Sequence, residues 1–408
     1  MNLEMFSNIK FKRRTYCMVC GTKLESSVIV LPKFPLTEVY VKQKVSKQLG
    51  FVNQEFHFCE RCGHGQIANV IDPEVLYGSC YKTRTSTSSS ATAAIDIFLL
   101  FISDVLGNKK VETIFEIGCN DLYMLQKLKD KAEVLYGIDP ILKGKECLLN
   151  DDKIKVIGDF FENVEIKHLG LKMDVVISSH TLEHIDDPKR LVENMLENSS
   201  PGTLLFFQFP SFESLVNDGH FDQVFHQHLN YFSLESVLYM LDEVGAELVN
   251  YRINPYHWGA LMIAFKKRIG SRSSHAKFKM HVQEISKDYI IKQYQVFRDC
   301  MDVTIRRIEA LEKETIYGYG AALMLPVLYY YLGNSLLRLK CIIDEDKSKK
   351  NLYYLNVPIQ IKMLDEIKDI DGSSVVVTAI NSTQAARAIT EKLMKLNVRQ
   401  IILPINII

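Results

Sequence analysis

The stretch TIFEIGCNDLYML (Thr113–Leu125) joins a buried strand to a helix through a short turn. Four more apolar runs follow it, VLYGIDP, IKVIGDF, MDVVISSH and GTLLFFQFP, and helical patterns separate most of them. Continuous apolar runs that alternate with helices indicate a parallel sheet covered on both faces. AELVNYRIN and ALMIAFKK then predict an antiparallel pair at the sheet edge. Residues 108–268 are therefore predicted to form a doubly wound α/β domain.

Other units flank this domain on both sides. Residues 1–67 carry short strand patterns around cysteine pairs, and residues 68–107 form a helical connector. The connector contains YKTRTSTSSSATAA, either a flexible linker or a hydroxyl-rich surface beside a ligand. Residues 269–312 predict a helical linker, because the charged and apolar positions alternate at helical spacing. In residues 313–408 the strand and helix patterns restart, which predicts a smaller Rossmann-like domain.

Length, composition and charge limit the classes of protein to which this chain can belong. A chain of 408 residues is expected to hold two or three domains. Lys+Arg and Asp+Glu both number 49, so no net field attracts nucleic acid or an anionic membrane. The start MNLEMFSNIKFKRRTYC has no apolar signal region, and DIFLLFISDVL is too short to span a bilayer. We therefore expect a cytoplasmic protein that binds neither nucleic acid nor membrane, with reduced cysteines.

Two cysteine pairs, CMVC and CERC, each precede a glycine. Four thiolates on two tight turns suit tetrahedral Zn²⁺, and the glycines allow the turn backbone its left-handed conformation. A closed shell of four thiolates leaves no position for a substrate, so this zinc is expected to be structural. The alternative is two redox pairs or unligated cysteines. The predicted ligands are Cys17, Cys20, Cys59 and Cys62.

The turn after the first strand of the α/β domain carries polar groups suited to a nucleoside. Glu116 lies on the strand, Gly118 follows it, and Asn120 and Asp121 begin the helix. Asp139 ends the next strand, where an acid suits the two hydroxyls of a ribose. GxGxxG is absent, so nothing cradles a pyrophosphate. This favours S-adenosylmethionine over a dinucleotide, although a plain strand–helix turn would also explain the pattern.

Two further strand ends add candidate residues. GDFF ends the third strand with Asp159 and Phe160, which suit the amino group and the face of an adenine. SSHTLEHIDDP ends the fourth strand with Ser179, His180 and His184, where the crevice of such a sheet is expected. His180 is expected to shape the cofactor pocket through its backbone, and His184 to close the loop or act in catalysis.

The stretch DQVFHQHLNYFS (Asp222–Ser233) places His226 and His228 two residues apart. The pair could be packed histidines, an acid/base site or metal ligands. Metal binding is disfavoured, because that loop supplies no third His, Asp or Glu at ligand spacing.

With these motifs assembled, the chain resembles the zinc-containing sugar C-methyltransferases. The resemblance covers the two CxxC pairs, FPLTE, DPEVLYGSCYKTRTS, EIGCND, SSHTLEHIDDP, FHQHLNYFS, HWGALMIAF, YGYGAA and IDEDKSKKNLYYLNVPI. It implies that S-adenosylmethionine lies over Gly118, Asn120, Asp121, Asp139 and the pair Asp159–Phe160. It also implies that a nucleotide-linked keto-deoxysugar lies between the α/β domain and the C-terminal domain. His228 would then remove the proton alpha to the ketone and leave an enolate.

This sequence departs from that family at three positions of the site. The family loop usually reads Tyr-His-Glu-His, but here Phe225 and Gln227 replace the tyrosine and the glutamate. Gln227 offers dipoles without charge, so either Tyr81, His184 or another donor fills the missing roles, or the substrate needs no carbon acid to be deprotonated. Leu122 replaces a common glycine and is expected to crowd the methionine end of the cofactor.

Several alternatives therefore stay open. The enzyme could be an O- or N-methyltransferase on a related sugar, or the chain could be a non-catalytic zinc-bearing binding module with a degenerate cofactor site. The turn YGYGAA could instead bind a nicotinamide cofactor, although its third glycine is missing. Because each chain holds a complete set of predicted site residues, we expect a monomer or a weak homodimer.

Overall fold

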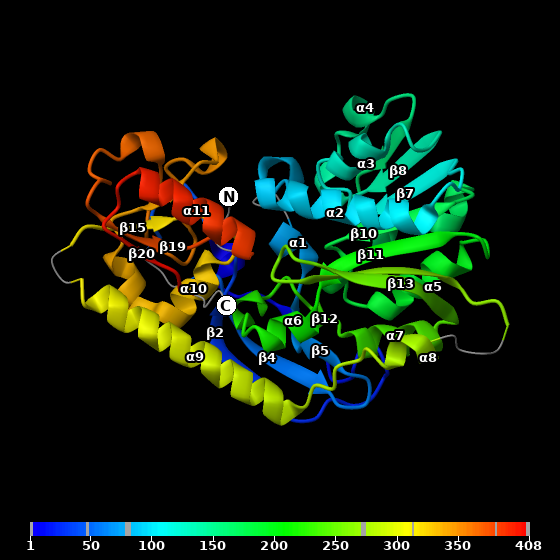
Figure 1. Ribbon diagram of the computed structural model, residues 1–408, viewed down its shortest axis with the longest axis horizontal. Helices are drawn as coiled ribbons and strands as arrows, with labels where there is room; N and C mark the ends of the chain where they lie inside the picture. The colour runs from blue at the N-terminus through cyan, green and yellow to red at the C-terminus, as the bar shows by residue number, and fades with distance from the viewer. Residues whose placement is uncertain are drawn as a thin grey trace.

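The computed structural model describes residues 3–45, 49–77, 83–270, 275–311, 314–379 and 382–404. Figure 1 shows the C-terminal domain, in orange and red, beside the central domain, in cyan and green. The N-terminal strands, in blue, lie below and between them. The long helix α9 (Lys287–Glu309) runs along the lower edge of the molecule on the side of the C-terminal domain.

The central domain is built on a seven-stranded sheet with the order β13-β14-β11-β10-β7-β8-β9. Neighbouring strands from β11 to β9 are parallel, whereas β14 is antiparallel to both β11 and β13. This confirms the α/β fold class and the antiparallel edge pair expected from the sequence. The strands are β7 (Thr113–Ile117), β8 (Val134–Ile138), β9 (Ile154–Ile157), β10 (Val175–Ser179), β11 (Leu204–Pro210), β13 (Ala246–Asn254) and β14 (Ala260–Lys267).

Short helices connect these strands, and side chains cap the N-termini of α5, α6 and α7. Asp187 accepts a hydrogen bond from the Arg190 amide at the start of α5, and Ser233 and Ser236 form a capping box at the start of α7. Each such cap stabilises a helix by about 1 kcal/mol. The helices are α3 (Tyr123–Leu128), α4 (Glu146–Leu149), α5 (Pro188–Glu197), α6 (Phe212–Asn217) and α7 (Leu234–Glu243).

Helix α2 (Ser89–Leu106) is the one described helix that is long and apolar enough to cross a membrane by length and composition. The helix begins inside the Ser/Thr stretch and is therefore longer than the segment DIFLLFISDVL. The expectation that this segment is too short to span a bilayer does not hold for the whole helix. Phe98, Phe101 and Ile102 on its buried face share a hydrophobic cluster with Phe206 of β11. An apolar stripe on a sheet is the usual arrangement of a core-facing helix.

The N-terminal unit pairs with both of the other domains through strands. In the sheet β12-β5-β4-β2, strand β12 comes from the central domain and pairs antiparallel with β5. Strand β3 pairs with β17 of the C-terminal domain. Within the predicted helical connector, residues 69–71 form strand β6 paired with β1 rather than helix. The elements are β1 (Phe11–Arg13), β2 (Ile29–Pro35), β3 (Tyr40–Val41), β4 (Phe51–Cys59), β5 (His64–Ile67), β6 (Asn69–Ile71), α1 (Pro73–Tyr77) and β12 (Asn230–Tyr231).

The C-terminal domain has a five-stranded sheet, β18-β16-β15-β19-β20, in which all neighbours are parallel. This order agrees with the Rossmann-like fold expected from the sequence. Helix α8 (Ala276–Lys279) and helix α9 precede it. Its elements are β15 (Ile316–Tyr319), α10 (Leu325–Leu332), β16 (Ile342–Asp344), β17 (Tyr353–Tyr354), β18 (Ile361–Met363), β19 (Ser374–Val377), α11 (Thr383–Lys395) and β20 (Gln400–Ile402).

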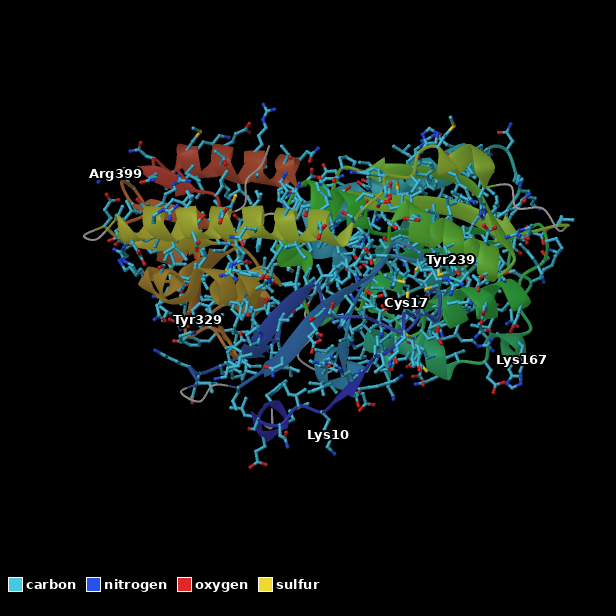
Figure 2. The ribbon with its side chains drawn as sticks, turned by 90° about the horizontal axis from the view of Figure 1, so that it is seen from below. Lys10, Cys17, Lys167, Tyr239, Tyr329 and Arg399 are labelled. Atoms are coloured by element: carbon cyan, nitrogen blue, oxygen red, sulfur yellow. The ribbon has the colours of Figure 1, made fainter. Side chains whose placement is uncertain are left out.

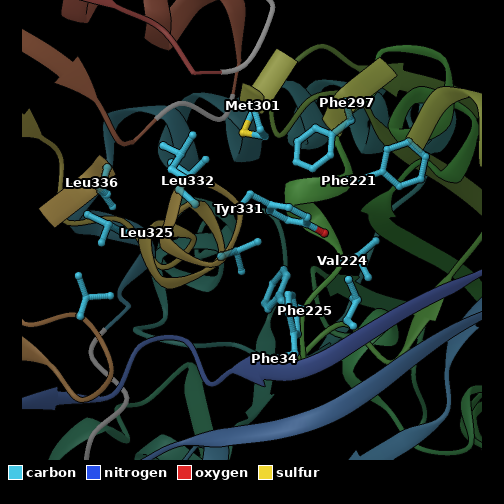
Figure 3. Close-up of a cluster of buried hydrophobic side chains, with 14 of the residues drawn as sticks. Phe34, Phe221, Val224, Phe225, Phe297, Met301, Leu325, Tyr331, Leu332 and Leu336 are labelled. Atoms are coloured by element: carbon cyan, nitrogen blue, oxygen red, sulfur yellow. The ribbon is translucent and has the colours of Figure 1, made fainter. Parts of the chain in front are cut away.

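One hydrophobic cluster joins the three units (Figure 3). It contains Phe34 of β2, Phe225 from the loop before β12, and Tyr331 of α10. Figure 3 shows Phe225 beside Phe34 and below Tyr331. The loop that carries His226 and His228 is therefore anchored where the three units meet.

Candidate active site

The four predicted zinc ligands lie close together. Their sulfur atoms are all within 4.8 Å of one another. Sγ of Cys17 is 3.6 Å from Sγ of Cys62, and Sγ of Cys20 is 3.4 Å from Sγ of Cys59. Tetrahedral zinc with bonds of about 2.3 Å requires sulfur atoms about 3.8 Å apart, so the cluster fits the ion. Cys17 also belongs to a hydrophobic cluster against which Tyr239 of α7 packs (Figure 2). The cysteine site is therefore packed against the central domain.

A cavity of about 1190 Å³ lies between the central and C-terminal domains. Strand ends of the central sheet line one part of it, and residues 319–324 and 343–349 of the C-terminal domain line another. Binding sites for one small ligand usually measure about 300–1,000 Å³, so this cavity has room for two. The cavity lies at the carboxyl ends of the parallel strands, where ligands of open α/β sheets bind.

Eight of the nine predicted cofactor residues line this cavity. Asp121 is the ninth: its Oδ2 instead accepts hydrogen bonds from the backbone and hydroxyl of Ser86, at 2.9 and 2.6 Å. The sequence therefore predicted the residues of this part of the cavity wall correctly except for Asp121. Asp121 binds the Ser/Thr segment and does not line the cavity. The eight are Glu116, Gly118, Asn120, Asp139, Asp159, Phe160, Ser179 and His180.

The chemistry of these residues fits S-adenosylmethionine. Glu116 is 3% exposed and its Oε2 has no hydrogen-bond partner in the described chain. Burial raises the pKa of Glu116 well above its usual value, and nearby Asp139 and Asp121 raise it further. An acidic, partly unsatisfied wall suits a ligand that carries an ammonium, a sulfonium and ribose hydroxyls but no phosphate. Both oxygens of Asp139 accept backbone hydrogen bonds, from Asn120 (2.8 Å) and Ile141 (3.0 Å), which fix the carboxylate in place.

The turn itself requires glycine at its first position. Gly118 has φ +75°, and a Cβ there would lie 2.0 Å from Oγ1 of Thr181. The Ser/Thr segment lies against this turn, because the Thr85 amide donates to Oδ1 of Asn120 (3.4 Å) and Nδ2 of Asn120 donates to the Thr83 carbonyl (3.3 Å). Of the two readings of that segment, the structure supports a hydroxyl-rich surface beside a ligand site.

Leu122 does not crowd the cofactor end of the cavity. Its side chain is 4% exposed, packs in the core of the central domain, and is not among the residues that line the cavity. The expectation of crowding is therefore wrong. The left-handed backbone at Leu122 (φ 66°) explains why glycine suits this position, because glycine adopts it without steric cost.

We expect Leu122→Gly to weaken the fold without changing cofactor affinity. Emptying a buried leucine site costs about 2–5 kcal/mol, and relief of the left-handed backbone returns about 1–2 kcal/mol. Denaturant unfolding should therefore show a net loss of about 2 kcal/mol, and at most about 4 kcal/mol. Calorimetric titration should give the same affinity for S-adenosylhomocysteine as the wild type. Tighter binding by the variant would show that Leu122 does obstruct the cofactor.

His226 lies in the core, away from the cavity. It is 0% exposed, and its two ring nitrogens contact Nε2 of Gln54 (3.2 Å) and the carbonyl of Phe34 (3.1 Å). One expectation from the sequence is an acid/base role for the pair His226 and His228. His226 does not line the cavity, so this role does not fit its position. Its contacts hold the loop against the N-terminal unit.

His228, His184 and Gln227 all line the cavity. The rings of His184 and His228 are 5.1 Å apart, and Nδ1 of His184 is 2.7 Å from the carbonyl of Gln227, to which it donates. Burial lowers the pKa of His228 well below its usual value, and His184 lowers it further. A neutral imidazole facing a cavity can accept a proton.

Gln227, which lines the same cavity, carries a side-chain donor without a partner among the described residues. Its Oε1 accepts a hydrogen bond from Oγ1 of Thr37 (2.6 Å), whereas its buried Nε2 has no partner in the described chain. Phe225, at the position of the family tyrosine, packs against His228 with ring centroids 4.1 Å apart. Tyr81, the other predicted donor, lies outside the described residues.

Four residues of the cavity wall were missed by sequence reasoning. Glu183 is 1% exposed and its Oε1 lies 3.1 Å from Nδ1 of His180. Burial raises the pKa of Asp222 to about 7. His257 and Trp258 both have left-handed backbones, with φ 54° and 57°, in the turn between β13 and β14. The motifs LEH and HWG contained three of them, but nothing in their spacing placed them beside His228.

Comparison with known proteins agrees with this geometry. A family described as a methyltransferase domain matches residues 91–251, and one described as a putative zinc binding domain matches residues 17–77. The chain therefore carries a class I methyltransferase domain with an N-terminal zinc-binding domain. These matches, with the four-cysteine cluster, confirm S-adenosylmethionine and zinc as the expected cofactors.

The chain is similar to the C-methyltransferase NovU of Streptomyces niveus, with 24% identity over 64% of this chain and 65% of that protein. The match thus spans just under two thirds of the relative. Among solved structures, the N-methyltransferase NodS of Bradyrhizobium japonicum has 16% identity and a TM-score of 0.35, covering 44% of this chain and 88% of that one. A methyltransferase of Clostridium acetobutylicum has 11% identity and a TM-score of 0.33, covering 43% and 92%.

Proposed function

We propose that this protein transfers a methyl group from S-adenosylmethionine to a carbon of a nucleotide-activated keto-deoxysugar. The observation that carries the proposal is the cavity lined by the cofactor residues, by His228 and by the C-terminal domain. The C-methyltransferase relative supports carbon as the acceptor. Lys347 and Lys349 also line the cavity, which supports a ligand with phosphate groups at the C-terminal domain, whereas Lys392 is ion-paired with Glu345.

In this proposal the chain positions two ligands and moves one proton. S-Adenosylmethionine held by Glu116, Asp139 and their neighbours supplies an activated methyl group. His228 removes the proton alpha to the ketone, so the C–H electron pair becomes the enolate and the proton moves to the imidazole. Nε2 of Gln227 donates to the ketone oxygen as its charge develops, which takes the place of the family tyrosine.

The first test measures the base without methyl transfer. Nucleotide-linked keto-deoxysugars are incubated with the protein and S-adenosylhomocysteine in deuterated water. The proposal expects NMR to detect exchange of the proton alpha to the ketone in at least one of them. Methyl transfer to oxygen or nitrogen without any such exchange would instead support the O- or N-methyltransferase alternative.

We expect Gln227→Leu to lower kcat by about 10²-fold, because loss of one preorganised donor to a developing oxyanion costs about 3 kcal/mol. The KM for the sugar should change much less, since the donor acts mainly on the charge that develops in the transition state. Steady-state kinetics with the accepted sugar measure both constants. Equal kcat values for the variant and the wild type would remove Gln227 from this role.

The same proposal bears on the oligomeric state of the protein and on its cellular compartment. Each chain holds the whole cavity, which supports action as a monomer or a weak homodimer. Nucleotide-activated sugars and S-adenosylmethionine are metabolites of the cytoplasm. An enzyme that uses both is therefore expected in that compartment. Analytical ultracentrifugation would test the oligomeric state directly.

A further inference from the structure

Two loops place Glu183, His184 and His228 around one point of the cavity wall. Each of these residues offers a metal-ligand atom, and these atoms lie within 4.8 Å of one another. The loops are tied together by their backbones. The amide of Leu229 donates to the carbonyl of Glu183 (2.7 Å), and Nδ1 of His184 is bound to the carbonyl of Gln227. The group is therefore held in place by the protein alone.

The ring nitrogens of His184 are arranged as in histidines that bind metals. Because Nδ1 of His184 donates to a backbone carbonyl, its Nε2 carries the lone pair and lies 4.0 Å from Oε1 of Glu183. A ligating histidine commonly uses its second nitrogen in this way, which fixes the tautomer and the direction of the ring. The ring of His228 is held by packing, with its centroid 4.1 Å from that of Phe225 and 5.1 Å from that of His184.

The carboxylate provides an independent observation. Glu183 is 1% exposed, and its Oε2 has no hydrogen-bond partner in the described part of the chain. Leaving a buried acceptor unsatisfied costs about 1–3 kcal/mol, and more for a charged group. A cation bound to this carboxylate would compensate its buried charge, and one carboxylate oxygen lies within 4.8 Å of a ring nitrogen of each of the two histidines.

We propose that Glu183, His184 and His228 bind one divalent transition-metal ion, such as Zn²⁺ or Co²⁺, at a site separate from the four cysteines. Two imidazoles and one carboxylate with open positions form a common set for such ions. Ligand atoms around a tetrahedral ion with bonds of about 2.1 Å are about 3.4 Å apart, so small side-chain rotations close the site.

The ion acts as an inhibitor of the proposed reaction. It takes the lone pair of His228, which then cannot accept a proton from the substrate. This consequence rests on the proposed function, whereas the binding of the ion does not. Metal beyond the structural zinc should therefore stop both the proton exchange and the methyl transfer, and a chelator that spares the cysteine site should restore them.

Titration of the full-length, zinc-loaded protein with Co²⁺ tests the site. We expect one additional cobalt per chain, with visible bands of nitrogen and oxygen ligation and no thiolate charge-transfer absorption. Glu183→Gln and His184→Gln should each abolish this binding while keeping the wild-type melting temperature within a few degrees. His168→Ala is the matched control, because it removes a histidine from an exposed pair with Glu165, and it should bind cobalt like the wild type.

Three results would overturn the proposal. The first is the absence of any additional cobalt on the wild-type protein. The second is cobalt bound only with thiolate absorption, which means exchange at the cysteines. The third is undiminished cobalt binding by both variants. The results for the metal site can be distinguished from the results for the proposed function. Cobalt binding without any methyl transfer supports the site and counts against the function, whereas methyl transfer without cobalt binding supports the function and rejects the site.

Discussion

Replacing His228 with alanine is expected to lower methyl transfer by about 10²–10⁴-fold, the usual contribution of a general base. The same variant should lose the exchange of the substrate proton into deuterated water. Its affinity for S-adenosylhomocysteine should stay near that of the wild type, because the cofactor residues lie at other strand ends. Radiolabelled methyl transfer, NMR and calorimetry measure the three quantities.

His168→Ala serves as the control for His228→Ala, since His168 is an exposed surface histidine with side-chain exposure of 70%. It should keep full transfer, exchange and binding. Proton exchange that persists in His228→Ala would assign the base to another residue. His184 is the next candidate, because its ring lies 5.1 Å from that of His228.

Replacing Cys62 with serine is expected to release the zinc and lower the melting temperature by about 10 °C or more. Structural zinc contributes about 10–16 kcal/mol in small zinc-binding domains. Cys62 is 0% exposed and shares its cluster with residues of α7, so loss of the ion also loosens the central domain. Metal analysis and thermal unfolding measure both effects.

The same substitution should also reduce turnover, although the zinc lies outside the cavity. Strand β5 pairs with β12, and the amide of Ile67 donates to the carbonyl of Leu229, the residue after His228. Cys147→Ser is the matched control, because Cys147 is exposed and is not among the four clustered cysteines. It should keep zinc, stability and turnover. A Cys62→Ser protein with wild-type zinc content and melting temperature would contradict the structural role.

The features predicted well from the sequence have local causes. The two CxxC pairs define their ligands through spacing, and the continuous apolar runs define the parallel strands. Gly118 and Asp139 follow buried strands, and the carboxyl ends of parallel strands meet at one edge of a sheet. Their place in the cavity therefore follows from strand order alone.

The features that the sequence did not predict depend on side-chain direction or on contacts between distant segments. Leu122 has a left-handed backbone that turns its side chain into the core, so the substitution for glycine does not reach the cavity. Phe225 packs between the three units, which explains an apolar residue where a tyrosine is usual. Glu183 lies 45 positions before His228 in the chain, and only the pairing of two loops brings them together.

All three units contribute to the walls of the cavity or to their support. Strand ends of the central sheet line one part of it, the C-terminal domain lines another, and the N-terminal unit contacts the His228 loop through β5, Gln54 and Phe34.

Transfer of a ¹³C-labelled methyl group from S-adenosylmethionine to nucleotide-linked keto-deoxysugars tests the central claim most directly. The account predicts that NMR will detect the label on a carbon next to the ketone in at least one sugar, and that His228→Ala will not form this product. The label on oxygen or nitrogen, or no transfer by a zinc-loaded protein that binds S-adenosylhomocysteine, would contradict it.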